Sequence, residues 1–340
     1  MNVSTNGVPK TNGTHKSNDS SNKPLKVGVV GVGHLGQHHA RIYEGLENVE
    51  LVGIVDVDEE QGKKVSDRHS TDYYRELSDL IPKLDAASVV VPTEHHFEVG
   101  KQLIENDVDC LIEKPMVQTL DEAERLYTLS KQNDVLLQVG HIERFNTAFN
   151  AARKYIDEPR YIEVNRLGPF TERSVDIGVV LDLMIHDIDI ILSLVDSPLK
   201  DIKSVGVSVL SDFEDLTNTR LEFENGCVAN LTASRVSMET RREIRIFQDQ
   251  NYVSLDYMDQ DVKVWRLKNG NARSMEDVEV YRPPVENDES LRRELSHFIH
   301  CIEEGREPVV GSEEGKDAIK VGLDVVEAMK EENQLNGIHG

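Results

Sequence analysis

A glycine turn directly follows a short apolar run near the start of the chain. The run 26–30 reads Lys-Val-Gly-Val-Val, which is typical of a strand buried on both faces of a parallel sheet. The turn 31–36 reads Gly-Val-Gly-His-Leu-Gly, and a segment of helical character, 35–46, overlaps its end. A second apolar run, 49–55, ends at Asp56. Strand, glycine turn, helix and strand in this order predict a βαβ unit.

Each glycine of this turn has its own task if the turn binds a dinucleotide. Gly31 makes the turn, Gly33 lets the backbone approach a pyrophosphate, and Gly36 allows the helix to pack closely on the strand. The start of the helix presents free N–H groups to the phosphates, so His34 and Leu35 belong to the predicted cofactor-binding set. The alternative is a glycine turn that only helps packing.

Asp56 closes the second strand about 20 residues after the last glycine of the turn. A carboxylate at this position hydrogen-bonds the hydroxyls of the adenine-side ribose. Its charge opposes a 2′-phosphate, and residues 57–60 bring no arginine to offset it. We therefore predict NAD as the cofactor, in preference to NADP.

The pattern of the chain changes near residue 142. Before it, apolar strands alternate with helices, which predicts a doubly wound parallel sheet, an α/β Rossmann domain over 25–142. After it, runs of period two are joined by short polar turns, which predicts an α+β domain with a large, mainly antiparallel open sheet over 143–340. We expect helices near 289–304 and 312–331, able to pack back on the first domain, and a disordered tail over 1–24.

The composition argues against several classes of partner. The chain has 38 Lys and Arg against 62 Asp and Glu, and a net charge of −24 opposes binding to nucleic acid or anionic lipid. Its three cysteines form no CxxC pair, and no apolar run is long enough for a secretion signal or a membrane span. We expect a cytoplasmic protein with a small-molecule substrate and no metal site.

Two further segments carry side chains suited to chemistry. Glu113, Lys114 and Pro115 follow the predicted strand 109–112, at the strand end where open α/β sheets bind ligands. Asp182 and His186 are spaced i and i+4, so on an α-helix they share one face. The alternatives are a solvated lysine and a pair that only stabilises its helix.

These segments resemble the Gfo/Idh/MocA family of sugar and polyol oxidoreductases. Glu113 to Pro115 match the Glu-Lys-Pro signature of that family, and 182–186 match its Asp-x-x-x-His. The segment 91–96 resembles its Thr-Pro-Asn-x-x-His, with Val91 in place of Thr and Thr93 in place of Asn. The resemblance extends from about residue 25 to about residue 329, in the same order.

The resemblance implies hydride transfer between a carbinol carbon and the nicotinamide. It makes Lys114 the residue expected to transfer the hydroxyl proton or to polarise the oxygen, with His186 as a second acid/base or a substrate ligand. Asp182 would orient His186 or hold a neighbouring hydroxyl. Contacts with the cofactor are implied for Pro92, Thr93, His96, Glu113 and Lys114.

Segments 140–146, 166–170 and 176–182 resemble family members that oxidise C3 of UDP-N-acetylglucosamine. Arg144, Arg166 and Arg173 would lie near the cleft, where guanidinium groups suit a diphosphate. We predict Arg144 and Arg166 as substrate-binding residues, together with Asp182 and His186. Ion pairs with acidic neighbours are the alternative for the arginines.

Three other functions fit the same sequence. One is a dehydrogenase or reductase of a free sugar or polyol such as an inositol. Another is an NAD-dependent glycosidase, and the third is a non-catalytic regulator that binds NAD and a sugar. The resemblance also implies a homo-oligomer, a dimer or a tetramer, built through the faces of the second sheet.

Overall fold

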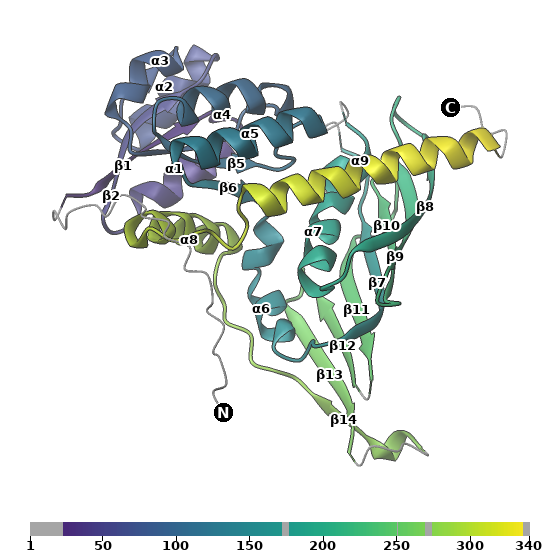
Figure 1. Cartoon of the computed structure of the whole chain (residues 1–340). Helices are drawn as coiled ribbons and strands as arrows, with labels where there is room; N and C mark the ends of the chain where they lie inside the picture. Colours follow the sequence, from purple (N-terminus) through teal and green to yellow (C-terminus); the bar gives the residue numbers. More distant parts are fainter. Residues whose placement is uncertain (1–22, 172–176, 250, 269–273, 336–340) are drawn as a thin grey trace, which may run out of the picture.

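The computed structural model describes residues 23–171, 177–249, 251–268 and 274–335, so most of the predicted tail lies outside it. Within these ranges the chain forms two sheets. The helix α9 (Ser312–Leu335) runs from the first to the second (Figure 1). The two sheets belong to the two halves of the chain that the change of pattern near residue 142 separates.

The first sheet has six parallel strands in the order β3-β2-β1-β4-β5-β6, which confirms the predicted Rossmann fold. A glycine turn and a helix separate β1 from β2, as predicted, whereas the two-residue β3 was not expected. The strands are β1 (Leu25–Val30), β2 (Val49–Val55), β3 (Tyr73–Tyr74), β4 (Ala86–Val89), β5 (Asp109–Glu113) and β6 (Leu137–Gly140).

Helices cover both faces of this sheet. One face packs on α1 and on α8, a helix from near the end of the chain, through apolar residues such as Tyr43 and Phe298. The other face packs on α4, α5 and the start of α9. The helices that connect or cover the strands are α1 (Gly36–Glu44), α2 (Glu59–Arg68), α3 (Leu77–Leu80), α4 (His96–Ile104), α5 (Leu120–Asn133) and α8 (Ser290–Glu304).

The second sheet has eight strands in the order β14-β13-β12-β11-β7-β10-β9-β8. All neighbours are antiparallel except β7 and β10, so the predicted large, mainly antiparallel sheet is confirmed. Its strands are β7 (Pro159–Leu167), β8 (Leu199–Val207), β9 (Leu216–Phe223), β10 (Val228–Ser234), β11 (Arg241–Gln248), β12 (Asn251–Asp256), β13 (Asp261–Leu267) and β14 (Val278–Tyr281).

One face of the second sheet is covered by α6 (Thr147–Arg153), α7 (Ile185–Leu194) and the later turns of α9. The sequence predicted that Asp182 and His186 lie on one α-helix, and this was wrong in detail. A π-helical segment, η4 (Val180–Met184), precedes α7. Its backbone hydrogen bonds span five residues, whereas those of an α-helix span four.

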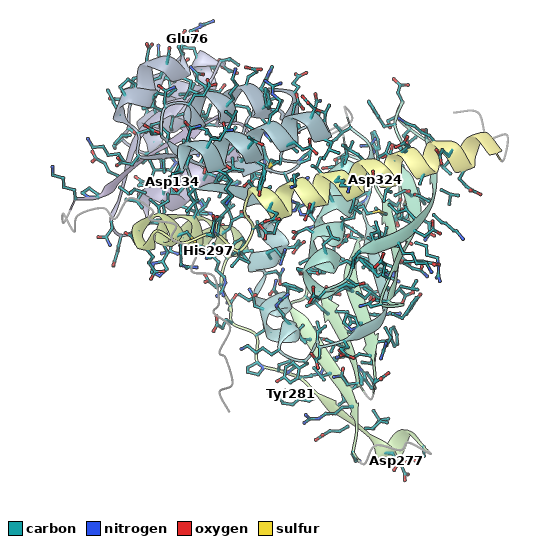
Figure 2. All side chains as sticks on the ribbon, viewed as in Figure 1. Glu76, Asp134, Asp277, Tyr281, His297 and Asp324 are labelled. Atoms are coloured by element: carbon teal, nitrogen blue, oxygen red, sulfur yellow. The ribbon has the colours of Figure 1, made fainter. Side chains whose placement is uncertain are left out.

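Acidic side chains project from both ends of the molecule in Figure 2, with Glu76 beside the parallel sheet and Asp277 at the tip beyond β13 and β14. None of the helices in the described ranges combines the length and the apolar character that a bilayer crossing requires.

Candidate active site

The glycine turn has the shape that a bound pyrophosphate needs. Gly31 has a φ of +87°, and a Cβ atom on Gly36 would lie 1.9 Å from the carbonyl oxygen of Gly31. Gly33 faces open space, with nothing within 4 Å of its Cβ position. His34 and Leu35 lie exposed at the crest of the turn, just before α1. The turn can therefore place backbone N–H groups against phosphate oxygens.

Asp56 holds this turn from the end of β2. Its Oδ2 accepts a hydrogen bond of 2.7 Å from the Val32 amide, and its Oδ1 accepts one of 2.9 Å from the Asp58 amide. The carboxylate is only half-buried, and each oxygen has a second lone pair to offer a ribose hydroxyl. Asp56 thus positions the turn and leaves a half-buried carboxylate beside it.

His96, which the resemblance gives as a cofactor contact, is buried between the loops that follow β4 and β5. Its Nδ1 and Nε2 each lie 2.9 Å from a backbone carbonyl oxygen, of Pro115 and Val91 respectively. Burial lowers the pKa of His96, so the ring is neutral near pH 7 and donates to one carbonyl at a time. His96 ties the loop after β4 to the loop after β5, whereas Pro92 is exposed and Thr93 half-buried.

Lys114 leaves the end of β5 and reaches the second domain. Its Nζ donates to the carbonyl oxygen of Asp182 at 2.7 Å and to Oδ1 of Asp182 at 3.0 Å. The two side chains are 19% and 16% exposed, so the ion pair is partly shielded from water. The Lys114 amide also donates to Glu113 Oε2 at 3.2 Å. The structure therefore brings together the lysine and the aspartate that sequence reasoning selected.

Asp182 lies in the π-helical segment, so the predicted α-helical face shared with His186 was wrong. The N-terminus of this segment is held by Glu214, whose Oε1 accepts from the Val180 amide at 3.3 Å. The wider π turn changes the angular spacing of the pair. Asp182 then binds Lys114, and His186 is the second residue of α7.

His186 is a neutral imidazole beside these charges. Burial, reinforced by the positive charges of Lys114 and Arg166, lowers the pKa of His186 well below its ordinary range. Its Nδ1 has no hydrogen-bond partner among the described residues. Its ring lies edge-on to the ring of His141, with 6.4 Å between centroids. A neutral imidazole with a free nitrogen is equipped to accept a proton.

The two arginines predicted to bind substrate are occupied by carboxylates. Arg144 Nε donates to Asp189 at 2.7 Å. Arg166 donates to both oxygens of Asp187 at 2.8 Å and to Glu143 at 3.0 Å. Both side chains are more than nine-tenths buried, which supports the ion-pair alternative and leaves no free fork for a diphosphate. Arg173 lies outside the described residues.

Sequence reasoning missed a fourth arginine, Arg242. It pairs in register with Arg166 across β11 and β7 and is exposed. Its charge helps to lower the pKa of His186, behind burial, Lys114, Arg166 and His141, which places it near the site. No acidic or hydrogen-bonding partner of its side chain lies among the described residues. Only the pairing of β11 with β7, which brings together residues 76 positions apart, reveals this position.

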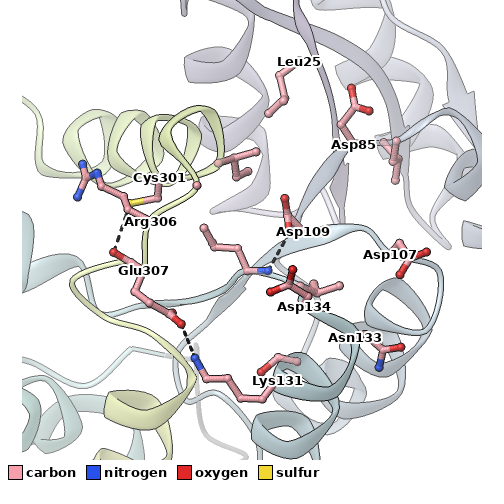
Figure 3. A pocket seen from close by; sticks show the side chains of 16 residues that line it. Leu25, Asp85, Asp107, Asp109, Lys131, Asn133, Asp134, Cys301, Arg306 and Glu307 are labelled. Atoms are coloured by element: carbon pink, nitrogen blue, oxygen red, sulfur yellow. Dashed lines mark hydrogen bonds and ion pairs between the residues drawn. The ribbon is translucent and has the colours of Figure 1, made fainter. Parts of the chain in front are cut away.

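A cavity of ≈ 370 Å³ lies elsewhere, at the amino ends of the parallel strands (Figure 3). Its lining includes Leu25 and Asp109, the first residues of β1 and β5, and Glu307, which binds Lys131. Ligands of doubly wound sheets bind at the carboxyl ends of the strands. This cavity is therefore distinct from the site around Lys114. Within the described ranges, no three His, Cys, Asp or Glu side chains are grouped so as to hold a metal ion.

Comparison with known proteins places this geometry in a family. Residues 25–141 match the family model described as an oxidoreductase family with an NAD-binding Rossmann fold, and residues 138–253 match the GFO/IDH/MocA C-terminal domain. The chain is 33% identical, over 88% of its length and 96% of the relative, to UDP-N-acetylglucosamine 3-dehydrogenase of Acidithiobacillus ferrooxidans. The chain belongs to the Gfo/Idh/MocA family of oxidoreductases. Its first domain is therefore an NAD-binding domain.

A further relative and two solved structures extend this comparison. The scyllo-inositol 2-dehydrogenase (NAD(+)) of Bacillus subtilis is 25% identical over 88% of this chain and 92% of its own length. The solved structure of the Acidithiobacillus ferrooxidans enzyme superposes with a TM-score of 0.84, at 32% identity, over 89% of this chain and 97% of that one. Levoglucosan dehydrogenase with NADH and L-sorbose shares the fold, with a TM-score of 0.82 at 18% identity over 91% and 98% of the two chains.

Proposed function

We propose that this oxidoreductase oxidises C3 of UDP-N-acetylglucosamine to the 3-keto sugar nucleotide, with NAD as the hydride acceptor. The observation that carries the proposal is the contact of Lys114 with Asp182, beside the neutral ring of His186. The identity of the substrate is supported by the 33% identity to a UDP-N-acetylglucosamine 3-dehydrogenase along almost its whole length.

The residues divide the work as follows. His186 accepts the hydroxyl proton, because burial and the neighbouring cations keep its imidazole neutral. Lys114 donates a hydrogen bond to the substrate oxygen and stabilises the negative charge that develops there. Asp182 orients the Lys114 ammonium group, and Glu113 fixes the lysine backbone through its amide. Bound NAD supplies the carbon that receives the hydride.

Arg242 is the residue we assign to the anionic part of the substrate. Its guanidinium group is exposed and has no carboxylate partner among the described residues, whereas Arg144 and Arg166 are neutralised by buried acids. A planar guanidinium fork suits the oxygens of a diphosphate. This assignment distinguishes a sugar nucleotide from a free sugar.

A second candidate substrate is a free polyol such as an inositol. It is favoured by the inositol dehydrogenases among the relatives, one of which matches over 92% of its own length. The residues assigned to proton transfer would serve either substrate, because both present a secondary alcohol. Arg242 would then have no anionic group to bind.

We also propose a cytoplasmic homo-oligomer. The three cysteines are buried and unpaired, which supports a reducing compartment. The sheet face opposite the helices carries a row of aromatic rings, with 5.7, 4.6 and 6.1 Å between successive centroids, from Tyr161, Phe247, Tyr252 and Trp265. A partly exposed aromatic row of this kind suits a subunit interface, which sedimentation of the purified protein tests.

The test uses the purified protein with NAD and, separately, UDP-N-acetylglucosamine, UDP-glucose, myo-inositol and glucose. NADH absorbance and product mass are followed together, with Lys114→Ala as the inactive variant and Lys64→Ala as a matched exposed control. Loss of two hydrogens from UDP-N-acetylglucosamine supports the proposal. Turnover of myo-inositol alone selects the polyol. Release of free sugar without net NADH indicates a glycosidase, and bound NAD with no product indicates a regulator.

A further inference from the structure

Two arginines, Arg144 and Arg166, hold the first turns of α7 on either side of His186. Arg166 Nε and Nη2 donate to the two carboxylate oxygens of Asp187, both at 2.8 Å. Arg144 Nε donates to Oδ2 of Asp189 at 2.7 Å. Successive residues of an α-helix are about 100° apart, so Asp187 lies about 100° to one side of His186 and Asp189 about 60° to the other. His186 is therefore flanked by two anchored side chains.

The two arginines are also connected to each other, through Glu143. Nη1 of Arg166 donates to Oε1 of Glu143 at 3.0 Å, and Glu143 directly precedes Arg144 in the 3₁₀ turn η3 (Ile142–Phe145). The contacts therefore close a circuit that runs from α7 to β7, from β7 to η3, and from η3 back to α7. We call it the ion-pair circuit, and its members are Glu143, Arg144, Arg166, Asp187 and Asp189.

The ion-pair circuit lies inside the protein. None of its side chains is more than 11% exposed, and the guanidinium group of Arg166 also lies over the ring of Tyr257, 5.6 Å from its centroid. Because desolvation of the charges offsets much of their attraction, buried ion pairs add little net stability, and in some proteins they serve to fix a geometry. The arrangement here suits the positioning of α7.

The ion-pair circuit spans the boundary between the two domains. The turn η3 follows β6, an edge strand of the parallel sheet, whereas β7 and α7 belong to the second domain. Glu143 is itself held by Asn146, whose Nδ2 donates to Glu143 Oε2 at 3.2 Å and whose Oδ1 accepts from the Ala148 amide at 3.0 Å. Through these contacts α7 is fixed relative to the carboxyl end of β6, on the side of the sheet that binds the cofactor.

The ring of His186 depends on α7 for its position. Its Nδ1 has no hydrogen-bond partner among the described residues, and the ring of His141 meets it edge-on, with 6.4 Å between centroids. His141 directly precedes η3, so the ion-pair circuit that fixes α7 also fixes the segment that carries the second ring. A rotation of α7 about its axis would therefore move the His186 ring away from His141.

We propose that Arg144 and Arg166 are positioning residues, which hold the His186 ring at the reacting hydroxyl by fixing α7 on both sides of it. The inference rests on the proposed function, which assigns proton transfer from the substrate to His186. Displacement of a reacting group by about 1 Å can lower a rate by about 100-fold. The two arginines thus act on the reaction through His186 and do not touch the substrate.

Two substitutions weaken the ion-pair circuit, and a third serves as control. Arg166→Lys keeps the positive charge but replaces the planar fork by a single ammonium group, so Asp187 is no longer held at two points. Asp187→Asn keeps the shape of the acid, but one acceptor becomes a donor and only one of the two hydrogen bonds remains. In Arg153→Lys the altered side chain is exposed and donates at 3.1 Å to the carbonyl oxygen of Ser193, at the far end of α7.

The first experiment follows the position of the His186 ring without any substrate. Nuclear Overhauser spectra of protein with labelled histidine should show a cross-peak between the rings of His141 and His186, assigned by its absence from His186→Asn. The cross-peak should be lost in Arg166→Lys, weakened in Asp187→Asn and unchanged in Arg153→Lys. An unchanged cross-peak in both circuit variants overturns the inference, and so does an equal loss in the control.

The second experiment separates kcat from KM, with NAD and UDP-N-acetylglucosamine as substrates. In Arg166→Lys kcat should fall by about 10- to 100-fold, and in Asp187→Asn by about tenfold, while KM for both substrates changes little. Arg153→Lys should match the wild-type protein. A rise in KM for NAD that accounts for the whole loss of kcat/KM overturns the inference, because the ion-pair circuit would then only join the domains.

Circular dichroism checks that each variant is folded. Should Arg166→Lys fail to fold, Asp187→Asn decides alone, because it keeps the shape of the side chain. Wild-type turnover with an unchanged kcat in the folded circuit variants overturns the inference and leaves the proposed function standing. Loss of the cross-peak in these variants, with no alcohol oxidised by the wild-type protein, supports the positioning of the ring and counts against the proposed function alone.

Discussion

Lys114 Nζ lies 3.0 Å from Oδ1 of Asp182 and 2.7 Å from the carbonyl oxygen of the same residue. One residue thus offers the lysine both a charge and a dipole, across the boundary between the two domains. This contact fixes the orientation of the Lys114 side chain, which belongs to the Glu-Lys-Pro segment at the end of β5. The site is therefore assembled only when both domains are in place.

Removing the lysine should abolish turnover but not cofactor binding. In Lys114→Ala we expect kcat to fall by at least about 100-fold, because the developing charge on the substrate oxygen loses its donor. NAD affinity, measured by quenching of protein fluorescence, should change little, since the glycine turn and Asp56 are untouched. Retained turnover in this variant would remove Lys114 from the mechanism.

The activity should be insensitive to pH around the ordinary pKa of a histidine. Burial and nearby cations hold the pKa of His186 well below 6.5, so its imidazole stays unprotonated and able to accept a proton at pH 6.5. We expect kcat/KM to be the same at about pH 6.5 and about pH 7.5, and to fall only at clearly lower pH. His186→Asn should lose this acid limb together with most activity. A midpoint close to 6.5 in the wild-type protein would contradict this assignment.

Arg242 should matter for a sugar nucleotide and not for a free polyol. Arg242→Gln is expected to raise KM for UDP-N-acetylglucosamine roughly 10- to 100-fold, the effect of one charge-assisted hydrogen bond. Its neighbour Arg241 lies on the other face of β11 and is paired with Glu239 and Glu243, so Arg241→Gln is a matched control. Equal KM changes in the two variants would show that Arg242 acts only through general charge.

Asp56 should set the preference for NAD. In Asp56→Ser the repulsion of a 2′-phosphate disappears, so the ratio of NAD to NADP use should fall by about tenfold or more. The amide of Val32 also loses its acceptor, which loosens the turn and raises KM for both cofactors. Glu60→Gln, an exposed change of the same charge nearby, should leave the ratio unaltered.

The pH dependence of the free energy of unfolding should reflect the raised pKa of the buried Glu294. The folded protein keeps this group protonated above pH 4.5, whereas the unfolded chain releases the proton, so the free energy of unfolding falls as pH rises through this window. The loss amounts to about 1.4 kcal/mol per pH unit for one proton. The free energy of unfolding should be measured with urea between about pH 5 and pH 8. As pH rises, Glu294→Gln should become more stable relative to the wild-type protein, whereas Glu303→Gln should follow the pH dependence of the wild-type protein.

The sequence was sufficient for those features that depend on neighbours along the chain. The glycine turn and Asp56 each follow a strand directly, and the alternation of strands and helices around them predicted the Rossmann sheet. The Lys114 to Asp182 contact could be expected only through resemblance to a family. Nothing local in either segment specifies a partner 68 residues away.

Features that depend on distant partners were not predictable. Arg166 was expected to face the substrate, but two carboxylates from other segments neutralise it. The π-helical turn around Asp182 depends on Glu214, which caps the segment from 34 residues beyond Val180. Glu294 drew no attention as one acid of a surface-like helix, and only the packing of α8 on α1 reveals its burial.

The helix α9 packs in the cores of both domains, which bears on how the protein unfolds. Ala318 and Ile319 pack in the core of the parallel sheet, and Val321 and Val325, on the following turns, pack in the core of the second sheet. A hinge between the domains would have to break this helix or empty one core. Heating should consequently unfold both domains in a single cooperative transition. Ligands should enter the cleft through movements of loops, while the two sheets keep their relative positions.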